Sequence, residues 1–355
     1  MELIDRINAF VSLGKIFISV ENNNIDQNLN PFEKASVADL EAVIPDLERM
    51  NPWFKQSNVI YALNALGESL SFDNLKTWLE AYDIPKTENN KLAGVVMAGN
   101  LPLVGFHDFL CVLISGNRLL AKMSSQDNKL LPMVSKMLCT IEPRFEGRIE
   151  FTEGRMQGFD AIIATGSGNT ARYFEYYFGK YPNIIRHNRN AVAVLNGDET
   201  EQDLIALSND VFMHFGLGCR NVSKLFVPKD YNFDRLFLAL DTHAYLKDHY
   251  KYFNNYEYYK SILLINSIKH FDNGFAILKQ DNAIASPISV LYYEYYDDID
   301  MVNNRLKYES ENVQCVVASA NQIDQSLPFG KAQAPELWDY ADGVDTMKFL
   351  LNLQP

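Results

Sequence analysis

The feature that most constrains the fold is a regular alternation, over residues 91–200, of short apolar runs with helical patterns. The apolar runs include KLAGVVMAG, NRLLAKM and DAIIA, and each of them ends in a turn. A short apolar run without polar alternation is typical of a strand that is buried on both faces. Strands that alternate with helices predict an α/β fold with a parallel sheet and helical crossovers.

The same pattern begins again at NAVAVLNGDET, near residue 190. A helix over 201–215, the strand SKLFVP, the strand–turn–helix segment ISVLYYEYYDDIDMVNNRL and the strand VQCVVASA follow. The first 83 residues instead show helical spacing, with Ser36 as the candidate N-cap of SVADLEAVIPDLERM. We therefore predict two Rossmann-like three-layer lobes with a helical N-terminal region: a helical region over 1–83, lobes over 84–188 and 189–325, and a return segment over 326–355.

The charge balance excludes one class of partner. The 355 residues carry 45 acidic and 32 basic side chains, a net charge of −13. We therefore expect no extended basic face and no nucleic-acid partner. The start, MELIDRINAFVSLGKIF, lacks the basic region of a signal peptide, and polar residues interrupt the most apolar stretch, 92–121. We expect no leader, no membrane span and a cytoplasmic location.

The cysteines supply one candidate nucleophile. The four of them show neither CxxC nor metal-ligand spacing, so we expect reduced thiols and no metal site. Cys219 lies within FGLGCRN, between a predicted helix and a predicted strand. Such a turn can present the sulfur and the backbone N–H together, as covalent acyl chemistry requires. The alternative is a small buried side chain, which the apolar surroundings of Cys111, Cys139 and Cys315 favour for those three.

Three further segments follow predicted strands and could meet a ligand. ATGSGNTAR places Thr165, Gly166 and Ser167 between a strand and a helix, where backbone N–H groups can bind phosphate. AGNLPL places Asn100 after a strand, where its amide could stabilise an oxyanion or cap the next turn. Lys122 ends the strand of NRLLAKMSS, so it could reach a ribose or a phosphate, or be solvated.

These segments, taken in order, resemble motifs of the aldehyde dehydrogenase superfamily. AGNLPL resembles its Asn-Phe-Pro stretch, GNRLLAKMSS its Gly-Asn-x-x-x-x-Lys-x-Ser strand, and ATGSGNTAR its Thr-Gly-Ser turn. FGLGCRN is similar to its Gly-Gln-x-Cys loop, and LPFGKAQ to its Pro-Phe-Gly segment. Within the superfamily the chain most resembles the acyl-CoA reductase family, which includes the fatty acid reductase of bacterial luminescence, and NPWF in the helical region adds to this likeness.

The resemblance implies NADPH-dependent reduction of a fatty acyl-CoA, or another acyl thioester, to the aldehyde. Cys219 would be the acyl-accepting nucleophile, and Asn100 would form the oxyanion hole with the Cys219 backbone N–H. Thr165, Gly166 and Ser167 would bind the nicotinamide and pyrophosphate side of the cofactor. Lys122 and Ser124 would bind its adenosine ribose or 2′-phosphate, and NADH is not excluded. The lobe over 84–188 would thus hold the cofactor, and that over 189–325 the nucleophile.

Two positions depart from the superfamily pattern. Hydrolytic members carry a Glu that activates water, and its position here is Ile185 in IIRHNRNAVAV. The resemblance therefore favours transfer of hydride rather than water to the acyl enzyme. The superfamily Glu that holds the nicotinamide ribose is replaced by Ala283 in AIASP.

Several alternatives stay open. The chain could act as a CoA-acylating aldehyde dehydrogenase in the oxidative direction, as a cofactor-free cysteine acyltransferase or thioesterase, or as a non-catalytic subunit. His214, five residues before the cysteine, could raise its thiolate fraction or be structural. The aromatic run HYKYFNNYEYYK could line an acyl tunnel or pack internally. A homodimer, or a complex with an acyl-activating or acyl-transfer protein, is also open.

Overall fold

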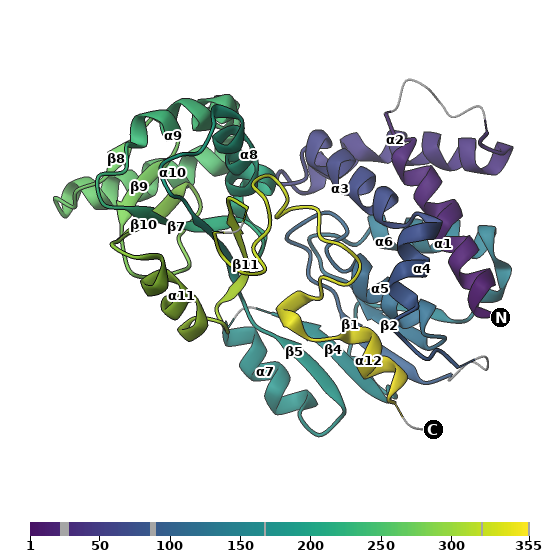
Figure 1. The fold of residues 1–355 in the computed structure, drawn as a ribbon. Coiled ribbons are helices and arrows are strands. Elements are labelled where there is room, and N and C mark those ends of the chain that lie inside the picture. The colour runs from purple at the N-terminus through teal and green to yellow at the C-terminus, as the bar shows by residue number, and fades with distance from the viewer. Residues whose placement is uncertain (22–27, 86–89, 167, 321, 354–355) are drawn as a thin grey trace. The chain divides into compact units, whose positions relative to one another are not determined.

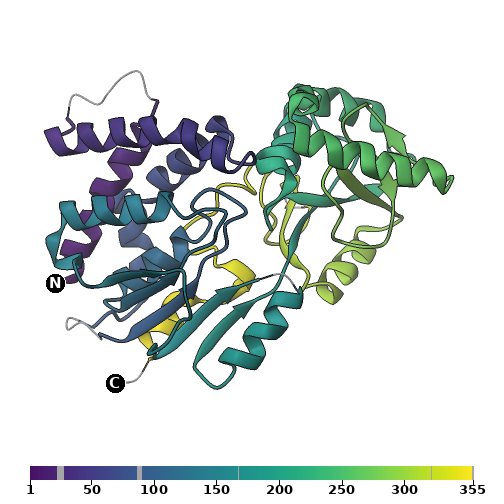
Figure 2. The ribbon, with the colours of Figure 1, turned by 180° about the vertical axis from the view of Figure 1, so that it is seen from behind.

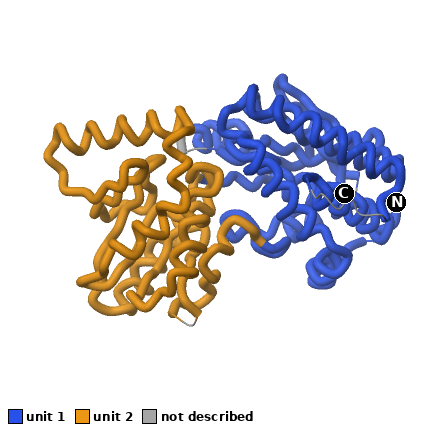
Figure 3. The backbone as a smooth tube through the Cα atoms, turned by 90° about the horizontal axis from the view of Figure 1, so that it is seen from above, with its two compact units in different colours: residues 1–187, 336–355 blue, residues 188–335 orange. Residues whose placement is uncertain are grey.

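The computed structural model describes residues 1–21, 28–85, 90–166, 168–320 and 322–353. The chain divides into two compact units, drawn in blue and orange in Figure 3. Unit 1 comprises Met1–His187 and Glu336–Pro355, and unit 2 comprises Asn188–Pro335. The predicted fold class is confirmed, because each unit contains a largely parallel sheet flanked by helices.

The N-terminal part of unit 1 is helical. Its helices are α1 (Leu3–Ile18), α2 (Pro31–Met50), α3 (Gln56–Ser69) and α4 (Phe72–Leu79). The expected N-cap at Ser36 is wrong: the N-cap of α2 is Asn30, six positions earlier, and its side chain accepts a hydrogen bond from the Glu33 N–H. The Glu33 carboxylate accepts from the Asn30 N–H in return, which completes a capping box ahead of Pro31. Ser36 is buried within the helix instead.

The sheet of unit 1 is parallel, with the strand order β3-β2-β1-β4-β5. Its strands are β1 (Leu92–Val96), β2 (Arg118–Lys122), β3 (Ile149–Thr152), β4 (Ala161–Thr165) and β5 (Asn183–Arg186). The crossovers include α5 (Phe106–Ile114), α6 (Leu130–Ile141), the 3-10 turn η1 (Pro143–Phe145) and α7 (Gly168–Phe178). This is the strand order of the dinucleotide-binding α/β fold. The chain adds β2 and β3 on one side of β1 and then β4 and β5 on the other side, so the order of addition reverses between β1 and β4.

Alternate residues of these strands enter two separate cores. Ala161 and Ile163 pack in the large core that also holds α1, α5 and α6. Ile162 and Ala164, between and beyond them, pack with Phe174 and Phe178 of α7 on the other face. The two-residue period of a strand therefore produces a sheet that is covered on both faces, as its apolar sequence indicates (Figures 1 and 2).

Unit 2 contains the second sheet, with the order β11-β6-β7-β10-β9-β8. Its strands are β6 (Asn190–Val194), β7 (Val222–Pro228), β8 (Phe271–Asp272), β9 (Ile277–Gln280), β10 (Val290–Tyr296) and β11 (Val313–Ala318). Only the edge pair β8–β9 is antiparallel among the described strand pairs of this sheet. Its helical elements are α8 (Glu201–Phe212), η2 (Met213–Gly216), α9 (Phe233–Leu240), η3 (Asp241–Asp248), α10 (Tyr250–Ile265) and α11 (Ile299–Tyr308).

The last residues of the chain return to unit 1. The 3-10 turn η4 (Ala341–Gly343) and α12 (Thr346–Leu351) follow Glu336. The Tyr340 hydroxyl accepts a hydrogen bond from the Trp78 indole N–H at 2.7 Å, and it lies 2.7 Å from the Tyr82 hydroxyl. These contacts attach the return segment to the helical region. Within the part of the chain that the structure describes, no helix is both long enough and apolar enough to span a membrane.

Candidate functional site

The structure brings several predicted residues to one edge of the unit 1 sheet. Lys122 ends β2 and pairs with Val96 of β1, which in turn pairs with Ala164 of β4, so these three residues form one row across the sheet. Thr165 ends β4, and Asn100 lies in the loop after β1. The carboxyl ends of these strands therefore place Asn100, Lys122 and Thr165 at the edge where open α/β sheets bind ligands.

Close packing explains the small residues at this edge. A Cβ on Gly99 would lie 2.3 Å from the Ser124 Oγ, so only glycine allows the Asn100 loop to approach the turn after β2. A Cβ on Gly166 would lie 2.9 Å from the Phe174 ring and from the Thr170 methyl group. The Ser124 hydroxyl accepts a hydrogen bond from the Gln126 N–H at 3.2 Å, which gives this side chain a role within its own turn.

Asp127 holds the loop that contains Asn100 through a hydrogen bond to the backbone of Leu103. This buried carboxylate accepts hydrogen bonds from the Leu103 N–H at 3.3 Å and from the Leu130 N–H at 3.4 Å. Burial raises the pKa of the Asp127 carboxyl, against the lowering effect of these backbone donors. Leu103 has a left-handed backbone with φ of 54°, a conformation that costs a non-glycine residue energy. The Asp127 bond to its N–H is one contact that holds this conformation.

These residues fit a nicotinamide dinucleotide. The strand order reverses between β1 and β4, and Thr165 and Gly166 follow β4 at that reversal, where such folds bind dinucleotides. α7 begins two residues later at Gly168, and the N-terminus of a helix is a place where a pyrophosphate can bind. Lys122 is half-buried at the end of β2, which is separated from β4 by β1, and it can supply a positive charge. Ser167, which the resemblance also assigns to the cofactor, lies outside the described residues.

Cys219 lies in unit 2, in a tight turn between α8 and β7. It is exposed, whereas Cys111 is buried and Cys139 and Cys315 are half-buried. The Asn221 N–H donates to the Gly218 carbonyl at 3.0 Å, which closes a four-residue turn with Cys219 at its second position. Exposure in a tight turn is the local environment that the sequence predicts for a nucleophile.

The segment before this turn has a left-handed backbone. The predicted helix over 201–215 ends early, at Phe212, because Met213 has a non-helical ψ of 140° and His214 and Phe215 follow with φ of 52° and 60°. Burial lowers the pKa of the His214 imidazole to about 4. His214 is therefore neutral near pH 7 and does not favour the Cys219 thiolate as a cation would.

Residues of the aromatic run over 249–260 pack against the segment that contains His214 and Phe215. The Phe215 ring packs on His249, with ring centroids 4.2 Å apart, and lies 6.3 Å from Tyr252. Tyr252 and Tyr256 are buried, and Tyr256 belongs to the core with Leu263 of the same helix. These contacts favour internal packing over the expectation that the run lines an acyl tunnel.

Sequence reasoning missed the residue that joins two of the motifs. Asp210, fully buried near the end of α8, accepts hydrogen bonds from the Gly330 N–H at 2.6 Å and the Ala332 N–H at 3.0 Å. The Arg220 Nε donates to the Ala332 carbonyl at 2.7 Å. The Pro-Phe-Gly segment is thus bonded both to α8 and to the residue after Cys219. Burial raises the pKa of the Asp210 carboxyl to about 6, although both backbone donors and Arg220 act to lower it.

The two departures from the superfamily pattern occupy defined positions. Ile185 lies in β5, paired with Ala164, and the next residue, Arg186, is held by Asp108. Ala283 is exposed, and its N–H donates to the Asp281 carboxylate at 3.0 Å. Neither position supplies a carboxylate of its own.

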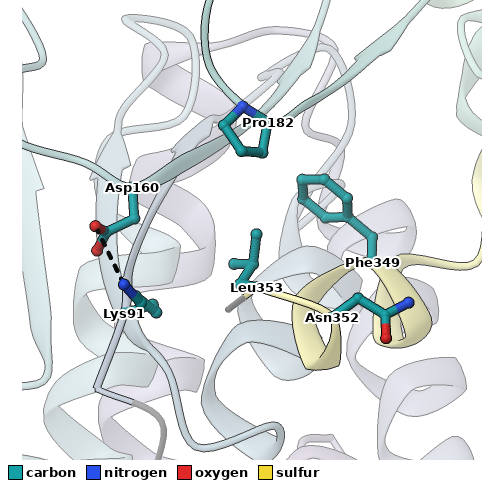
Figure 4. Close-up of a pocket in the computed structure, with 6 residues that line it drawn as sticks. All are labelled: Lys91, Asp160, Pro182, Phe349, Asn352 and Leu353. Carbon is teal, nitrogen blue, oxygen red and sulfur yellow. Dashed lines mark ion pairs between the residues drawn. The ribbon is translucent and has the colours of Figure 1, made fainter. Parts of the chain in front are cut away.

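A cavity of about 500 Å³ in unit 1 lies away from these residues. Lys91, Asp160 and Pro182 immediately precede β1, β4 and β5, so this cavity opens at the amino ends of the strands (Figure 4). It is lined by Lys91, Asp160, Pro182, Phe349, Asn352 and Leu353. Ligand sites of open α/β sheets lie at the opposite edge, so the carboxyl ends of the strands, and not this cavity, are the place where a dinucleotide could bind.

Comparison with solved structures identifies the fold. Over 87% of this chain and 78% of the other, it is similar to aldehyde dehydrogenase 21 from Physcomitrella patens, with a TM-score of 0.58 and 14% identity. It is similar to the aldehyde dehydrogenase KauB from Pseudomonas aeruginosa, over 94% of this chain and 75% of the other, with a TM-score of 0.59 and 11% identity.

A third similar structure is a mutant of the propionaldehyde dehydrogenase from a Clostridium phytofermentans bacterial microcompartment. It matches 94% of this chain and 82% of its own, with a TM-score of 0.59 and 9% identity. No protein-family model and no curated protein matches the sequence. The likeness therefore lies in the structure, and the chain has the aldehyde dehydrogenase fold.

Proposed function

We propose that this chain reduces a fatty acyl-CoA, or a related acyl thioester, to the aldehyde with NADPH, through a covalent acyl-Cys219 intermediate. The observation that carries the proposal is the exposed Cys219, held in a tight turn between α8 and β7 of a chain with the aldehyde dehydrogenase fold. The three other cysteines are buried or half-buried. The proposal extends the fold to a specific activity, substrate class and cofactor.

In the proposed reaction the Cys219 thiolate attacks the carbonyl carbon of the acyl thioester. A new carbon–sulfur bond forms, the bond to the CoA sulfur breaks, and CoA leaves as a thiolate that then takes up a proton. The carbonyl oxygen carries negative charge as the attack proceeds. The Cys219 backbone N–H would donate to this oxygen, and the resemblance assigns the second donor role to the Asn100 side-chain amide; one such donor commonly contributes about 3 kcal/mol.

The edge of the unit 1 sheet would bind the cofactor. Thr165 and Gly166, with Ser167, would contact its nicotinamide and pyrophosphate side, and Lys122 and Ser124 its adenosine ribose. A bound nicotinamide dinucleotide would supply a hydride to the thioester carbon, and the bond from this carbon to the Cys219 sulfur would then break, which releases the aldehyde and the Cys219 thiolate. The Lys122 ammonium favours a 2′-phosphate, which distinguishes NADPH from NADH. Ile185 offers no base to activate water, which favours reduction of the acyl enzyme over its hydrolysis.

Mass spectrometry of the intact protein tests the proposal. Incubation with a long-chain acyl-CoA should add one acyl group, and peptide mapping should place it on Cys219. NADPH should then remove the adduct and release the aldehyde. Cys219→Ala should abolish the adduct, whereas Cys315→Ala, which changes a half-buried thiol of the same unit, should leave it intact.

Other outcomes separate the alternatives. An adduct that NADPH does not remove, with free fatty acid as product, would identify a thioesterase and refute the reductase. Adduct formation from aldehyde only with an oxidised cofactor would support the oxidative, CoA-acylating direction. Aldehyde production by Cys219→Ala would refute the covalent route.

A further inference from the structure

We propose that Asn221 is a positioning residue for Cys219, which orients both the thiol and the Cys219 backbone N–H for attack on a thioester. This inference rests on the proposed function and deepens it. Asn221 is only 1% exposed and lies two residues after Cys219, immediately before β7. Each of its polar groups bonds to a part of the chain that shapes the turn.

The first set of bonds closes the turn itself. The Asn221 Oδ1 accepts from the Gly218 N–H at 2.7 Å, and the Asn221 N–H donates to the Gly218 carbonyl at 3.0 Å. Since C=O and N–H point in opposite directions across a trans peptide, the Cys219 N–H points away from Asn221 and out of the turn. Asn221 therefore fixes the direction of the proposed oxyanion donor.

The second set of bonds ties the turn to the end of α8. The Asn221 Nδ2 donates to the Met213 carbonyl at 2.8 Å, and it lies 3.1 Å from the Asp210 carbonyl and 3.3 Å from the Val211 carbonyl. The last carbonyls of a helix have no partner within the helix, so a side-chain amide can satisfy them. One side chain thus joins the strained end of the helix to the turn that carries the nucleophile.

The third bond anchors the residue to the sheet. The Asn221 carbonyl accepts from the Ala191 N–H of β6 at 3.1 Å. Only a primary amide offers an acceptor and two donors on one short side chain. Aspartate would keep the acceptor and lose both donors, and an apolar residue would leave Gly218 and the helix end without their bonds. The turn, the helix and the sheet therefore meet at a position that favours asparagine.

Two reactions of the same thiol test this role. Acylation of Cys219 by acyl-CoA requires an oriented oxyanion donor, whereas alkylation by iodoacetamide requires only an accessible thiolate. In Asn221→Ala we expect the acylation rate to fall about 100-fold, the effect of a misplacement of about 1 Å. Alkylation of Cys219, followed by peptide mapping, should change by less than about threefold.

Asn273→Ala is the matched control. The Asn273 Oδ1 accepts from the Ala276 N–H at 2.9 Å and its Nδ2 donates to Asp241 at 3.2 Å, so this residue also closes a loop of unit 2. Both rates should be unchanged in this variant. If Asn221→Ala does not fold, Asn221→Ser serves, because its shorter side chain can serve Gly218 or the helix end but not both, and its acylation rate should also fall.

The outcomes separate the two proposals. Equal loss of acylation and alkylation in a folded Asn221 variant, or no loss of either, would overturn the positioning role. A wild-type chain that acyl-CoA does not modify would overturn the proposed function. In that case hydrogen exchange at the Gly218 amide would still test whether Asn221 holds the turn. If this amide exchanges no faster in Asn221→Ala than in wild type, the positioning role of Asn221 is overturned as well.

Discussion

Replacing Arg186 with Met should destabilise unit 1 strongly. The Arg186 guanidinium donates two hydrogen bonds to the Asp108 carboxylate, at 2.5 and 2.7 Å, and a third to the Thr346 hydroxyl at 3.0 Å. The Arg186 and Asp108 side chains are only 7% and 8% exposed. The pair therefore joins the end of β5 to α5 and to the first residue of α12.

The magnitude follows from the burial of the pair. Removing one partner of a buried ion pair typically costs about 3–5 kcal/mol, because the remaining charge is left buried without compensation. With a urea slope of about 3 kcal/mol per M, the unfolding midpoint should fall by roughly 1–1.7 M. The double variant Asp108→Leu with Arg186→Met should regain much of this loss, since no buried charge remains.

The tryptophans provide a selective assay. Trp53, Trp78 and Trp338 all belong to unit 1, so tryptophan fluorescence in urea reports the unfolding of that unit. Arg144→Met is the control, because Arg144 forms ion pairs with Glu142 and Asp5 in the same unit while 52% of its side chain is exposed. Solvent screens such a pair, so its midpoint should barely move. A midpoint for Arg186→Met equal to that of the control would refute the reasoning.

Three further predictions concern unit 2 and the proposed site. Burial raises the pKa of the Asp210 carboxyl to about 6, so the folded chain is favoured below pH 4 and loses stability as the pH rises through 6. Asp210→Asn should remove this loss, so its free energy of unfolding relative to wild type should rise by about 3 kcal/mol between pH 4 and pH 7. Urea unfolding followed by circular dichroism measures this difference. A difference between the two proteins that does not change with pH would contradict the raised pKa of Asp210. Lys122→Met should raise the Kd for NADPH about 10-fold or more and affect the Kd for NADH less, and equal effects in calorimetry would remove Lys122 from the phosphate site. Ile185→Glu should increase fatty acid release from acyl-CoA by about 10-fold or more relative to Ile185→Gln, and no difference between these variants would show that position 185 does not control access of water.

The sequence could predict the strands because the composition of a buried strand differs from that of the segments around it. Strands that are covered on both faces consist of consecutive apolar residues, and the runs predicted around β1, β2, β4, β6 and β10 all form strands. The turn at Cys219 could also be predicted, because glycines on both sides of a leucine indicate a turn, whereas the sequence left open whether the thiol is exposed or buried. The helix end was harder to place: nothing in the spacing of 201–215 reveals that His214 and Phe215 adopt left-handed φ.

The start of α2 shows a different limit. Asn30, Pro31 and Glu33 form a complete capping signal. Ser36 lies closer to the first regular apolar positions, and for this reason it was predicted as the N-cap. Periodicity locates the interior of a helix, whereas the capping residues decide where the helix begins. A search for the capping box ahead of the periodic stretch would have found the correct residue.

The contacts around Cys219 could not be predicted, because they join residues that are distant in sequence. Asp210 and Gly330 are bonded across 120 positions, and neither residue has a pattern that names the other. Burial of the Asp210 carboxylate is costly, and its two hydrogen bonds from backbone N–H groups offset part of that cost. They hold the Pro-Phe-Gly segment to α8, and the Asn221 amide holds the same helix end to the Cys219 turn. Two motifs that look like separate loops in the sequence are therefore parts of one hydrogen-bonded unit, which includes the turn that carries Cys219.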